Sequence, residues 1–287
     1  MAGERRNALQ YIPKNAAPLV DSCGGLVNAE EFSRYKFGDT AIAKKYGIQL
    51  ARFAAENYPD VVFYAPKVAV LTSDFQQTPS SSTVLTQTFA DELTRIRAQH
   101  SASPAKLIMV EKRYTEEIVV KEHYGDRRLR QKSYAHVDPK EVEGHAVFFV
   151  DDVRASGAQE RRIEKLLEPI QTASVNFLYA LMFDEEEASR NSKLEFFLMH
   201  SFVRNLQTLS TIINDPNFAI NRRVCKFFLS QNNPHEIQDF LSRQSDSFLR
   251  ELYLASLADE LNKFPDYQVA WVALESEING RLEKQTA

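Results

Sequence analysis

Cysteine is scarce in this chain of 287 residues, which contains only Cys23 and Cys225. The two lie far apart and outside any CxxC pattern, so the sequence predicts neither a disulfide framework nor a zinc site. The six histidines show no HxxxH or HxH spacing, which argues against a transition-metal site built from histidine. We expect both cysteines to be reduced thiols, and no metal ligand is assigned to any residue.

Long apolar runs are absent as well. No stretch approaches the roughly 18 uncharged apolar residues that a membrane helix requires, and Met1–Lys14 lacks the apolar centre of a secretory signal. A basic excess is also missing: the formal net charge is −4, whereas general binders of nucleic-acid backbones carry excess positive charge. We therefore expect a cytoplasmic protein without a membrane or nucleic-acid partner, in which any anion site is local.

Short apolar runs alternate with helical patterns in the middle of the chain. This alternation predicts βαβ units and an α/β fold around a mostly parallel sheet. Helices are expected at Thr83–Gln99 and from about Ala158. The expected strands are Val61–Tyr64, Val68–Thr72, Lys106–Val110, Ala146–Val150 and Ser174–Met182.

The two flanks of this middle region have different patterns. Met1–Asn28 is predicted to be an irregular lead-in, and two helices are expected between Ala29 and Asn57. Amphipathic helices follow at Leu194–Ile213, Arg222–Ser230, His235–Arg243, Ser247–Asn262 and Tyr267–Leu282. We expect an N-terminal helical hood (1–60), a core (61–185) and a helical C-terminal extension (186–287). Such an extension suits a cap over the core or the surface of a homodimer.

One segment carries a pattern typical of a ligand site. Four apolar residues, Val147–Val150, lead directly into Asp151 and Asp152, and a turn then opens a helical pattern. The first amides of a helix have no partner inside the helix, so this turn predicts a phosphate site. Gly157 permits close approach of the backbone, and Ser156 adds a hydroxyl donor. Adjacent carboxylates at the end of a strand can accept hydrogen bonds from a pair of sugar hydroxyls.

These residues resemble the phosphoribosyl pyrophosphate signature of the type I phosphoribosyltransferases, which implies a Rossmann-like fold. The resemblance implies that Asp151 and Asp152 meet the ribose 2- and 3-hydroxyls and act as catalytic residues. The 5-phosphate loop it implies consists of Arg154, Ala155, Ser156, Gly157, Ala158 and Gln159.

Three positions depart from the family pattern. Arg154 stands where an apolar residue is usual, Ala155 where threonine or aspartate is common, and Gln159 where a threonine often ends the loop. With fewer side-chain donors, the backbone amides and Ser156 carry more of the phosphate binding. A catalytic base, if the reaction needs one, must come from elsewhere.

The resemblance also places a pyrophosphate loop after the first core strand. Here Val68–Thr72 runs into a loop rich in hydroxyl groups, Ser73–Ser82, ahead of a helix. The candidate pyrophosphate ligands are Thr72, Ser73 and Asp74. On composition alone, a solvated loop of serine and threonine explains this segment equally well.

A basic segment, Glu111–Gly144, matches the flexible active-site loop of the family. Its cations would strengthen their bonds to pyrophosphate as that group leaves. Lys112 and Arg113 are the first candidates for this catalytic role. An ordinary solvated hairpin, with Ile118–Val120 pairing near Tyr134, remains the alternative.

Two smaller segments are open to two interpretations each. Arg34–Asp39 is either part of a hood over the acceptor or a helix break with its cap. Asp184–Glu187 either faces the acceptor or begins a solvated helix.

The resemblance implies transfer of a phosphoribosyl group from phosphoribosyl pyrophosphate to an unidentified acceptor, with nitrogen as the expected nucleophile. Mg²⁺ is the expected cofactor, held mainly by pyrophosphate and water. Two alternatives stay open. The first is a regulatory protein that senses phosphoribosyl pyrophosphate or a nucleotide without catalysis, and the second is a Mg²⁺-dependent phosphohydrolase that uses Asp151.

Overall fold

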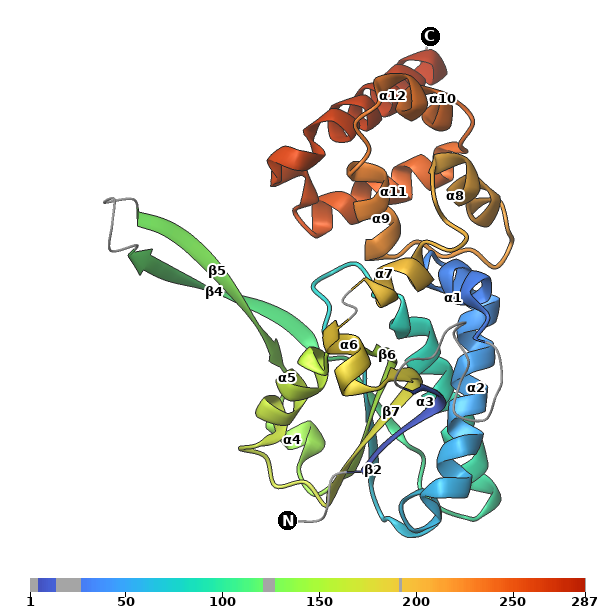
Figure 1. Ribbon diagram of the computed structural model, residues 1–287, viewed down its shortest axis with the longest axis vertical. Coiled ribbons are helices and arrows are strands. Elements are labelled where there is room, and N and C mark those ends of the chain that lie inside the picture. The colour runs from blue at the N-terminus through green and yellow to red at the C-terminus, as the bar shows by residue number, and fades with distance from the viewer. Residues whose placement is uncertain (1–4, 14–26, 121–126, 191–192, 287) are drawn as a thin grey trace.

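The computed structural model describes residues 5–13, 27–120, 127–190 and 193–286, so Cys23 lies outside the described residues. A five-stranded parallel sheet forms the centre, in the order β1-β7-β6-β2-β3. The mostly parallel α/β architecture expected from the sequence is confirmed (Figure 1). The strands are β1 (Arg5–Ile12), β2 (Val68–Leu71), β3 (Lys106–Ile108), β6 (Ala146–Arg154) and β7 (Ser174–Phe183).

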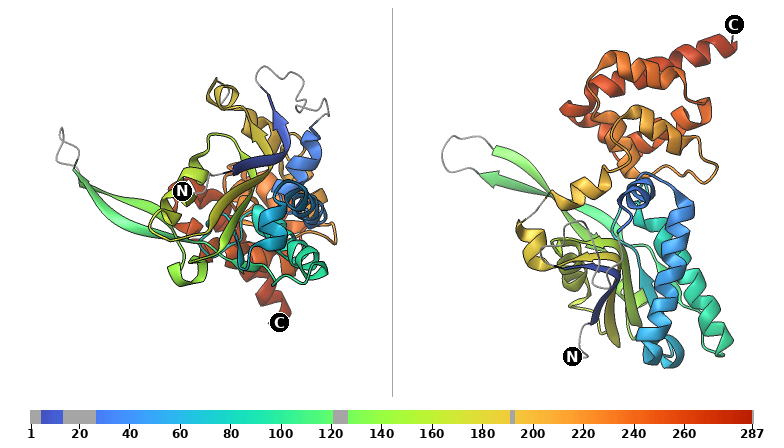
Figure 2. Two further views of the ribbon diagram at one scale, coloured as in Figure 1. Left: turned by 90° about the horizontal axis from the view of Figure 1, so that it is seen from below. Right: turned by 45° about the vertical axis from the view of Figure 1, so that its right-hand side comes forward.

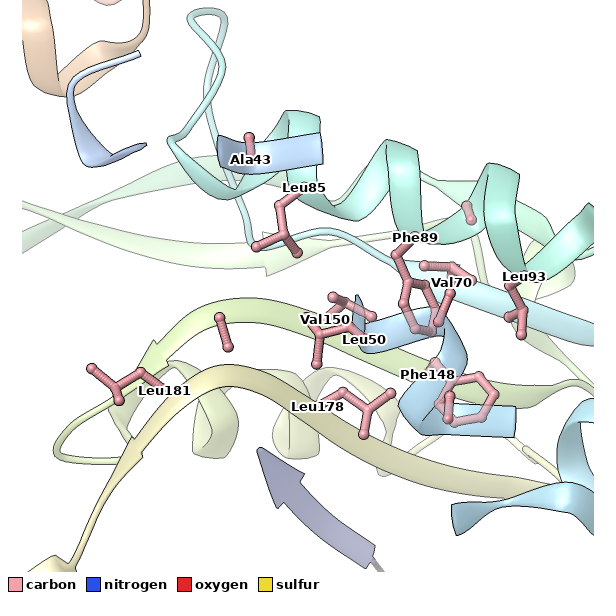
Figure 3. Close-up of a cluster of buried hydrophobic side chains, with 14 of the residues drawn as sticks. Ala43, Leu50, Val70, Leu85, Phe89, Leu93, Phe148, Val150, Leu178 and Leu181 are labelled. Carbon is pink, nitrogen blue, oxygen red and sulfur yellow. The ribbon is translucent and has the colours of Figure 1, made fainter. Parts of the chain in front are cut away.

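Both faces of the sheet are covered, because β2 and the first five residues of β6, Ala146–Val150, are apolar on both faces. Phe148 and Val150 of β6 pack with helices on one face, where Leu85 and Phe89 contribute to the core (Figure 3). Residues of opposite parity in β6 face a second apolar cluster. The first face is covered by α2 (Thr40–Asn57) and α3 (Ser82–Gln99), and the second by α4 (Pro139–Val142) and α5 (Ala158–Leu167).

A separate helical unit lies beyond the carboxyl ends of the strands (Figures 1 and 2). It has its own apolar core, which includes the buried thiol of Cys225 and receives Phe37 from the N-terminal segment. Its helices are α8 (Leu206–Ile213), α9 (Arg222–Leu229), α10 (Pro234–Ser242), α11 (Asp246–Ala258) and α12 (Gln268–Thr286), with short turns η2 (Leu261–Lys263) and η3 (Pro265–Tyr267). Two short helices, α6 (Glu185–Arg190) and α7 (Leu194–Met199), connect it to β7.

The predicted strand Val61–Tyr64 is wrong, because these residues lie in a π-helical turn, η1 (Asp60–Tyr64). A short apolar run does not distinguish a strand from a buried helical turn. Three carbonyls in and after this turn accept hydrogen bonds from the fully buried guanidinium of Arg97, namely those of Val61 (3.3 Å), Val62 (2.5 Å) and Ala65 (2.9 Å). Arg97 thus supplies the donors that a neighbouring strand would otherwise provide.

The irregular lead-in predicted for Met1–Asn28 is also wrong in part, since β1 pairs with β7 at the edge of the sheet. The long helix predicted at Leu194–Ile213 is two helices, α7 and α8. It breaks where Asn205 caps α8 and Thr208 completes a reciprocal capping box.

The two helices expected between Ala29 and Asn57 are confirmed as α1 (Ala29–Lys36) and α2. Asp39 caps α2 by accepting a hydrogen bond from the Ile42 amide. The segment Arg34–Asp39 therefore forms a helix break with its cap. Two of its side chains, Tyr35 and Lys36, also contact Asp152.

An antiparallel hairpin projects from the body of the molecule and consists of β4 (Glu111–Val120) and β5 (Arg127–His136). The hairpin predicted as an alternative within Glu111–Gly144 is present, but the predicted pairing of Ile118–Val120 near Tyr134 is wrong. Ile118 pairs with Leu129, and Tyr134 pairs with Arg113. Among the residues whose placement is given, no helix is both long and apolar enough to cross a membrane.

Candidate functional site

A cavity of about 350 Å³ lies at the carboxyl end of β6, and we call it the β6 cavity. Because the strands are parallel, the loops after β2, β6 and β7 meet at this edge of the sheet. The cavity brings together most of the predicted site residues: Asp151, Asp152, Arg154, Ala155, Ser156, Gly157, Ala158, Gln159, Ser73 and Asp74. It also contains Lys36 of the possible hood segment, Ser81 and Ser82 of the hydroxyl-rich loop, and Glu195 and Arg223, for which no role was predicted.

Asp152 is buried and already holds three protein donors. Its Oδ2 atom accepts from Lys36 Nζ at 2.7 Å, from Ser81 Oγ at 2.8 Å and from the Tyr35 hydroxyl at 3.2 Å. Burial by itself would raise the pKa of Asp152, but the charge and hydrogen bond of Lys36, with help from Ser81, lower it below the ordinary value. Asp152 is therefore the member of the acid pair that loses its proton more readily.

Asp151 is the member that more readily keeps a proton. Its burial, followed by the adjacent charge of Asp152, raises the pKa of Asp151, while Lys36 and Ser82 partly oppose that rise. The two carboxyls titrate as a pair, because each charge affects the other. One site thus holds a carboxylate and a neighbouring acid of raised pKa, an arrangement that is frequent at functional sites.

The turn after β6 presents free backbone donors to the cavity. Gly157 has φ +67° and directly precedes α5, so the chain turns sharply into the first amides of that helix. Within the described part of the chain, no acceptor bonds the backbone amides of Ser156, Gly157, Ala158 or Gln159. A Cβ atom at Gly157 would lie 3.1 Å from the guanidinium groups of both Arg154 and Arg161. Backbone donors and a close approach are thus both available for an anion.

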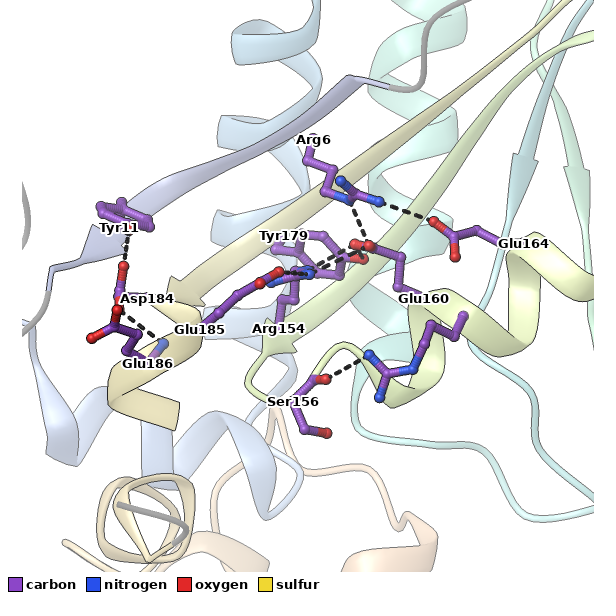
Figure 4. A network of polar contacts seen from close by, with 11 residues as sticks. Arg6, Tyr11, Arg154, Ser156, Glu160, Glu164, Tyr179, Asp184, Glu185 and Glu186 are labelled. Atoms are coloured by element: carbon purple, nitrogen blue, oxygen red, sulfur yellow. Dashed lines mark hydrogen bonds and ion pairs between the residues drawn. The ribbon is translucent and has the colours of Figure 1, made fainter. Parts of the chain in front are cut away.

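Arg154 lines the β6 cavity, but its guanidinium bonds to carboxylates of the protein. Its Nε donates to Glu160 at 2.8 Å, and its Nη2 donates to Glu185 at 2.8 Å (Figure 4). Glu160 also accepts from the Tyr179 hydroxyl at 2.8 Å and from Arg6 Nε at 2.5 Å. This network ties the end of β6 to α5, β7 and β1, which explains why an arginine stands at a position that is usually apolar.

Asp74 joins the loop after β2 to the beginning of α5. Its carboxylate accepts hydrogen bonds from the side-chain amide of Gln159 and from Arg162, the latter at 3.1 Å. Arg162 also donates to the Ser133 carbonyl at 3.0 Å, at the base of the hairpin. Asp74 and Gln159 are thus both engaged in a contact between loops.

A group of hydroxyls lies beside the acid pair. Ser73 and Ser82 are 2.6 Å apart between their Oγ atoms, and Ser80 lies 3.1 Å from each. Ser81 and Ser82 in turn contact Asp152 and Asp151. The loop after β2 therefore supplies donors to the same cavity as the turn after β6.

Three predicted residues do not line the β6 cavity. The buried Thr72 hydroxyl accepts from the Val110 amide at 3.0 Å and so joins two strand ends. The Lys112 amide donates to the Phe75 carbonyl at 2.8 Å, and Arg113 pairs with Glu111 at 2.7 Å. Lys112 and Arg113 lie at the base of the hairpin, where their side chains serve local contacts.

The helical unit shapes the loop after β2, a role that no sequence pattern indicated. Asp259, fully buried, accepts from the amides of Gln77 (3.1 Å) and Thr78 (3.0 Å) and pairs with Arg222 Nε at 3.0 Å. The amide of Arg222 donates to the Pro79 carbonyl at 3.0 Å. Because Asp259 lies some 180 residues away along the chain, only the tertiary structure brings it to this loop.

A parallel α/β sheet with a carboxylate pair, a free-amide turn and a hydroxyl-rich loop at one edge defines a protein of the type I phosphoribosyltransferase fold. The chain belongs to the family described as PRTase ComF-like, which matches residues 24–270. No curated protein matches the chain in sequence.

Several solved structures are similar to parts of the chain. Adenine phosphoribosyltransferase from Saccharomyces cerevisiae is 16% identical over 54% of this chain and 76% of its own, with a TM-score of 0.34. Hypoxanthine phosphoribosyltransferase from Staphylococcus aureus is 11% identical over 48% of this chain and 64% of its own, with a TM-score of 0.28. Phosphoribosylpyrophosphate synthetase from Mycobacterium smegmatis is 15% identical over 47% of this chain and 33% of its own, with a TM-score of 0.30. Such distant similarities carry no argument about substrate or activity.

Proposed function

We propose that this chain transfers the 5-phosphoribosyl group of phosphoribosyl pyrophosphate to a nitrogen acceptor and releases pyrophosphate. The observation that carries the proposal is the set of unbonded amides at Ser156–Gln159 beside the acid pair, in one cavity. These amides suit a 5-phosphate, because a helix N-terminus favours an anion. The acceptor nitrogen would bond to C1 of the ribose as the bond from C1 to the pyrophosphate oxygen breaks, and pyrophosphate would keep that electron pair.

The acid pair suits the ribose diol. All three donors held by Asp152 bind its Oδ2 atom, which leaves Oδ1 and the Asp151 carboxyl as acceptors for the two hydroxyls. Two carboxyls next to C1 would also stabilise the positive charge that develops on the sugar as the leaving group departs. Lys36 keeps Asp152 ionised and fixes its orientation, and so acts as a positioning residue.

Lys36 and Tyr35 link the segment Arg34–Asp39 to the proposed ribose site. They connect α1 directly to Asp152, at distances of 2.7 and 3.2 Å. The helix α1 would then cover the ribose as a hood. The predicted division was a hood (1–60), a core (61–185) and an extension (186–287), but β1 and α2 lie within 1–60 and belong to the sheet and its cover.

Mg²⁺ fits this site only as an ion held largely by its ligand. Among the residues placed by the structure, no group of three or more acidic, histidine or cysteine side chains forms a metal cage. Asp151 is the carboxylate best placed to contact such an ion, directly or through water, because Lys36 neutralises Asp152. When bound, the ion would neutralise charge on the departing pyrophosphate.

The non-catalytic alternative also has support from the structure. Lys112 and Arg113, the cations expected on the leaving group, are engaged in local contacts outside the β6 cavity. A protein that senses phosphoribosyl pyrophosphate would need the amides and the acid pair but not these cations.

Two measurements test the proposal. Isothermal titration with phosphoribosyl pyrophosphate and Mg²⁺ should show binding that the double variant Asp151→Asn/Asp152→Asn loses. Release of pyrophosphate in the presence of nitrogen acceptors then separates an enzyme from a sensor. Unchanged binding by the double variant refutes the site. Release of inorganic phosphate from phosphate monoesters, without binding of phosphoribosyl pyrophosphate, would instead support the phosphohydrolase.

A further inference from the structure

A second, larger cavity adjoins the β6 cavity and faces the helical unit. Its volume is about 740 Å³, within the range of small-molecule sites. We call it the cationic cavity, because none of its lining residues is acidic and four are basic. The four basic residues are Arg204, Arg222, Arg223 and Lys226. Ser80, Ser81 and Arg223 line both cavities, so the two cavities lie side by side.

The positive charge of the cationic cavity is only partly compensated by the protein. Asp259 pairs with Arg222, but it also accepts from two loop amides. In the described part of the chain, the buried Nε of Arg223 has no hydrogen-bond partner. Loss of hydration and the charges of Arg222, Lys112 and Arg223 lower the pKa of Lys226, and the opposing charge of Asp259 does not offset them. An anion bound here would relieve this repulsion.

One wall of the cationic cavity is aromatic. Phe227 stacks on His200 with ring centres 5.8 Å apart, and Phe196 lies 4.3 Å from His200. Phe37 meets Phe227 edge to face at 5.1 Å. Phe196 is 61% exposed, so a large apolar ring stands at the cavity without protein to cover it. Aromatic walls favour flat ligands, and pyrophosphate has no apolar face to place against them.

We infer that the cationic cavity binds the acceptor, and that the acceptor is a planar aromatic molecule with an acidic group, either a carboxylate or a phosphate. The aromatic wall would hold the ring, and the cations would hold the acid group. Through Arg223 and Ser81 the ring nitrogen would face the ribose held by Asp151 and Asp152. The identification of this ligand as the acceptor rests on the proposed function. Binding of an acidic aromatic molecule in the cationic cavity can be tested independently of that function.

The test uses two charged probes and their neutral counterparts. Pyridine-3-carboxylate is compared with pyridine-3-carboxamide, and phenyl phosphate with benzyl alcohol, by isothermal titration of the full chain with and without phosphoribosyl pyrophosphate. We expect at least one acid to bind about tenfold more tightly than its neutral counterpart, as for a charge-assisted hydrogen bond. The probe that binds better identifies the acid group as a carboxylate or a phosphate.

Two pairs of variants locate the binding. Lys226→Gln should weaken the binding of the acid about fivefold, while Lys263→Gln, an exposed lysine of the same helical unit outside the cavity, should not. Phe196→Ala should weaken all ring probes, whereas Phe197→Ala, which is 64% exposed and outside the lining, should not. None of the four should change the binding of phosphoribosyl pyrophosphate alone.

Three outcomes overturn the inference: neither acid binds better than its neutral counterpart, Lys226→Gln has no effect, or pyrophosphate competes with the acid for the same site. Failure of phosphoribosyl pyrophosphate to bind is a different result. It would refute the proposed function, while binding of the acid that depends on Lys226 and Phe196 would still establish the cationic cavity as a ligand site.

Discussion

The β6 cavity and the cationic cavity differ in how their charged side chains are partnered. In the β6 cavity, Asp152 is paired with Lys36, and Arg154 is paired with Glu160 and Glu185. In the cationic cavity, the lining charges are all positive and only Arg222 has a carboxylate partner among the ion pairs of the described residues. Charges paired within the protein hold a site in shape, whereas unpaired charges of one sign leave binding energy for a ligand.

The largest loss of stability should come from breaking the buried ion pair between Asp152 and Lys36 in the β6 cavity. Asp152→Ala leaves the Lys36 ammonium buried without its partner, so we expect a loss of about 3–5 kcal/mol in the free energy of unfolding. Asp152→Ala/Lys36→Met should lose much less than the sum of the two single variants. Urea denaturation measures all three. Additive losses would mean that the pair does not act as a unit.

A smaller but still large effect is expected at the turn. Gly157→Ala places a Cβ on a residue with φ +67° and 3.1 Å from two guanidinium groups, which should cost about 1 kcal/mol of stability. Because the amides would shift, the affinity for phosphoribosyl pyrophosphate should fall about tenfold or more. Gly144→Ala, which also has positive φ but meets no atom within 4 Å, is the matched control. It should lose similar stability and no affinity, and equal losses of affinity in both would contradict the phosphate site.

The pH dependence of stability should distinguish the two acids. Since the folded-state pKa of Asp151 is raised, the folded chain binds more protons there than the unfolded chain, so this carboxyl lowers stability as pH rises from its unfolded pKa through its folded pKa. Asp152 has a lowered pKa and contributes stability above its unfolded pKa that is lost as pH falls through its folded pKa. Asp151→Asn should therefore reduce the loss of stability that occurs as pH rises toward neutral, and it should also weaken ligand binding. Thermal unfolding from pH 4 to 8 measures this, and an unchanged profile would contradict the assignment.

The smallest effect is expected at the base of the hairpin. Arg113 is exposed and pairs locally with Glu111, so Arg113→Gln should change the affinity for phosphoribosyl pyrophosphate less than about twofold, in the range of exposed ion pairs. If Arg113 instead stabilises the leaving pyrophosphate, the variant would keep that affinity and lose turnover. Comparing titration with steady-state rates separates these outcomes.

Local patterns in the sequence were enough to predict four of the five strands of the sheet and the turn after β6. Hydrophobic periodicity indicates where strands and helices alternate. The acids and the glycine of the turn lie within a few residues of one another in the chain. The strand predicted at Val61–Tyr64 is a helical turn, in which Arg97, a residue distant in sequence, satisfies the carbonyls of Val61 and Val62. The strand β1 escaped notice because a polar edge strand, RRNALQYI, has little periodicity of its own.

The rest of the site could not be read from local patterns, because long-range contacts create it. Lys36 lies 116 residues from Asp152 along the chain, and Arg223 reaches the same cavity from the helical unit. The sequence marks Arg34–Asp39 as a possible hood, and the structure brings Lys36 and Tyr35 from that segment onto Asp152. Nothing in the sequence indicated that Arg154 would turn toward Glu160.

The contact between Asp259 and the loop after β2 has a practical consequence for dissecting this protein. A chain cut after residue 190 would keep every strand of the sheet and the whole motif after β6, and its fold could still be recognised. It would nevertheless lose the carboxylate that binds the amides of Gln77 and Thr78 and the carbonyl of Ala255 that accepts from the Thr78 hydroxyl at 2.9 Å. An inactive truncated fragment would therefore say little about the catalytic competence of the intact molecule.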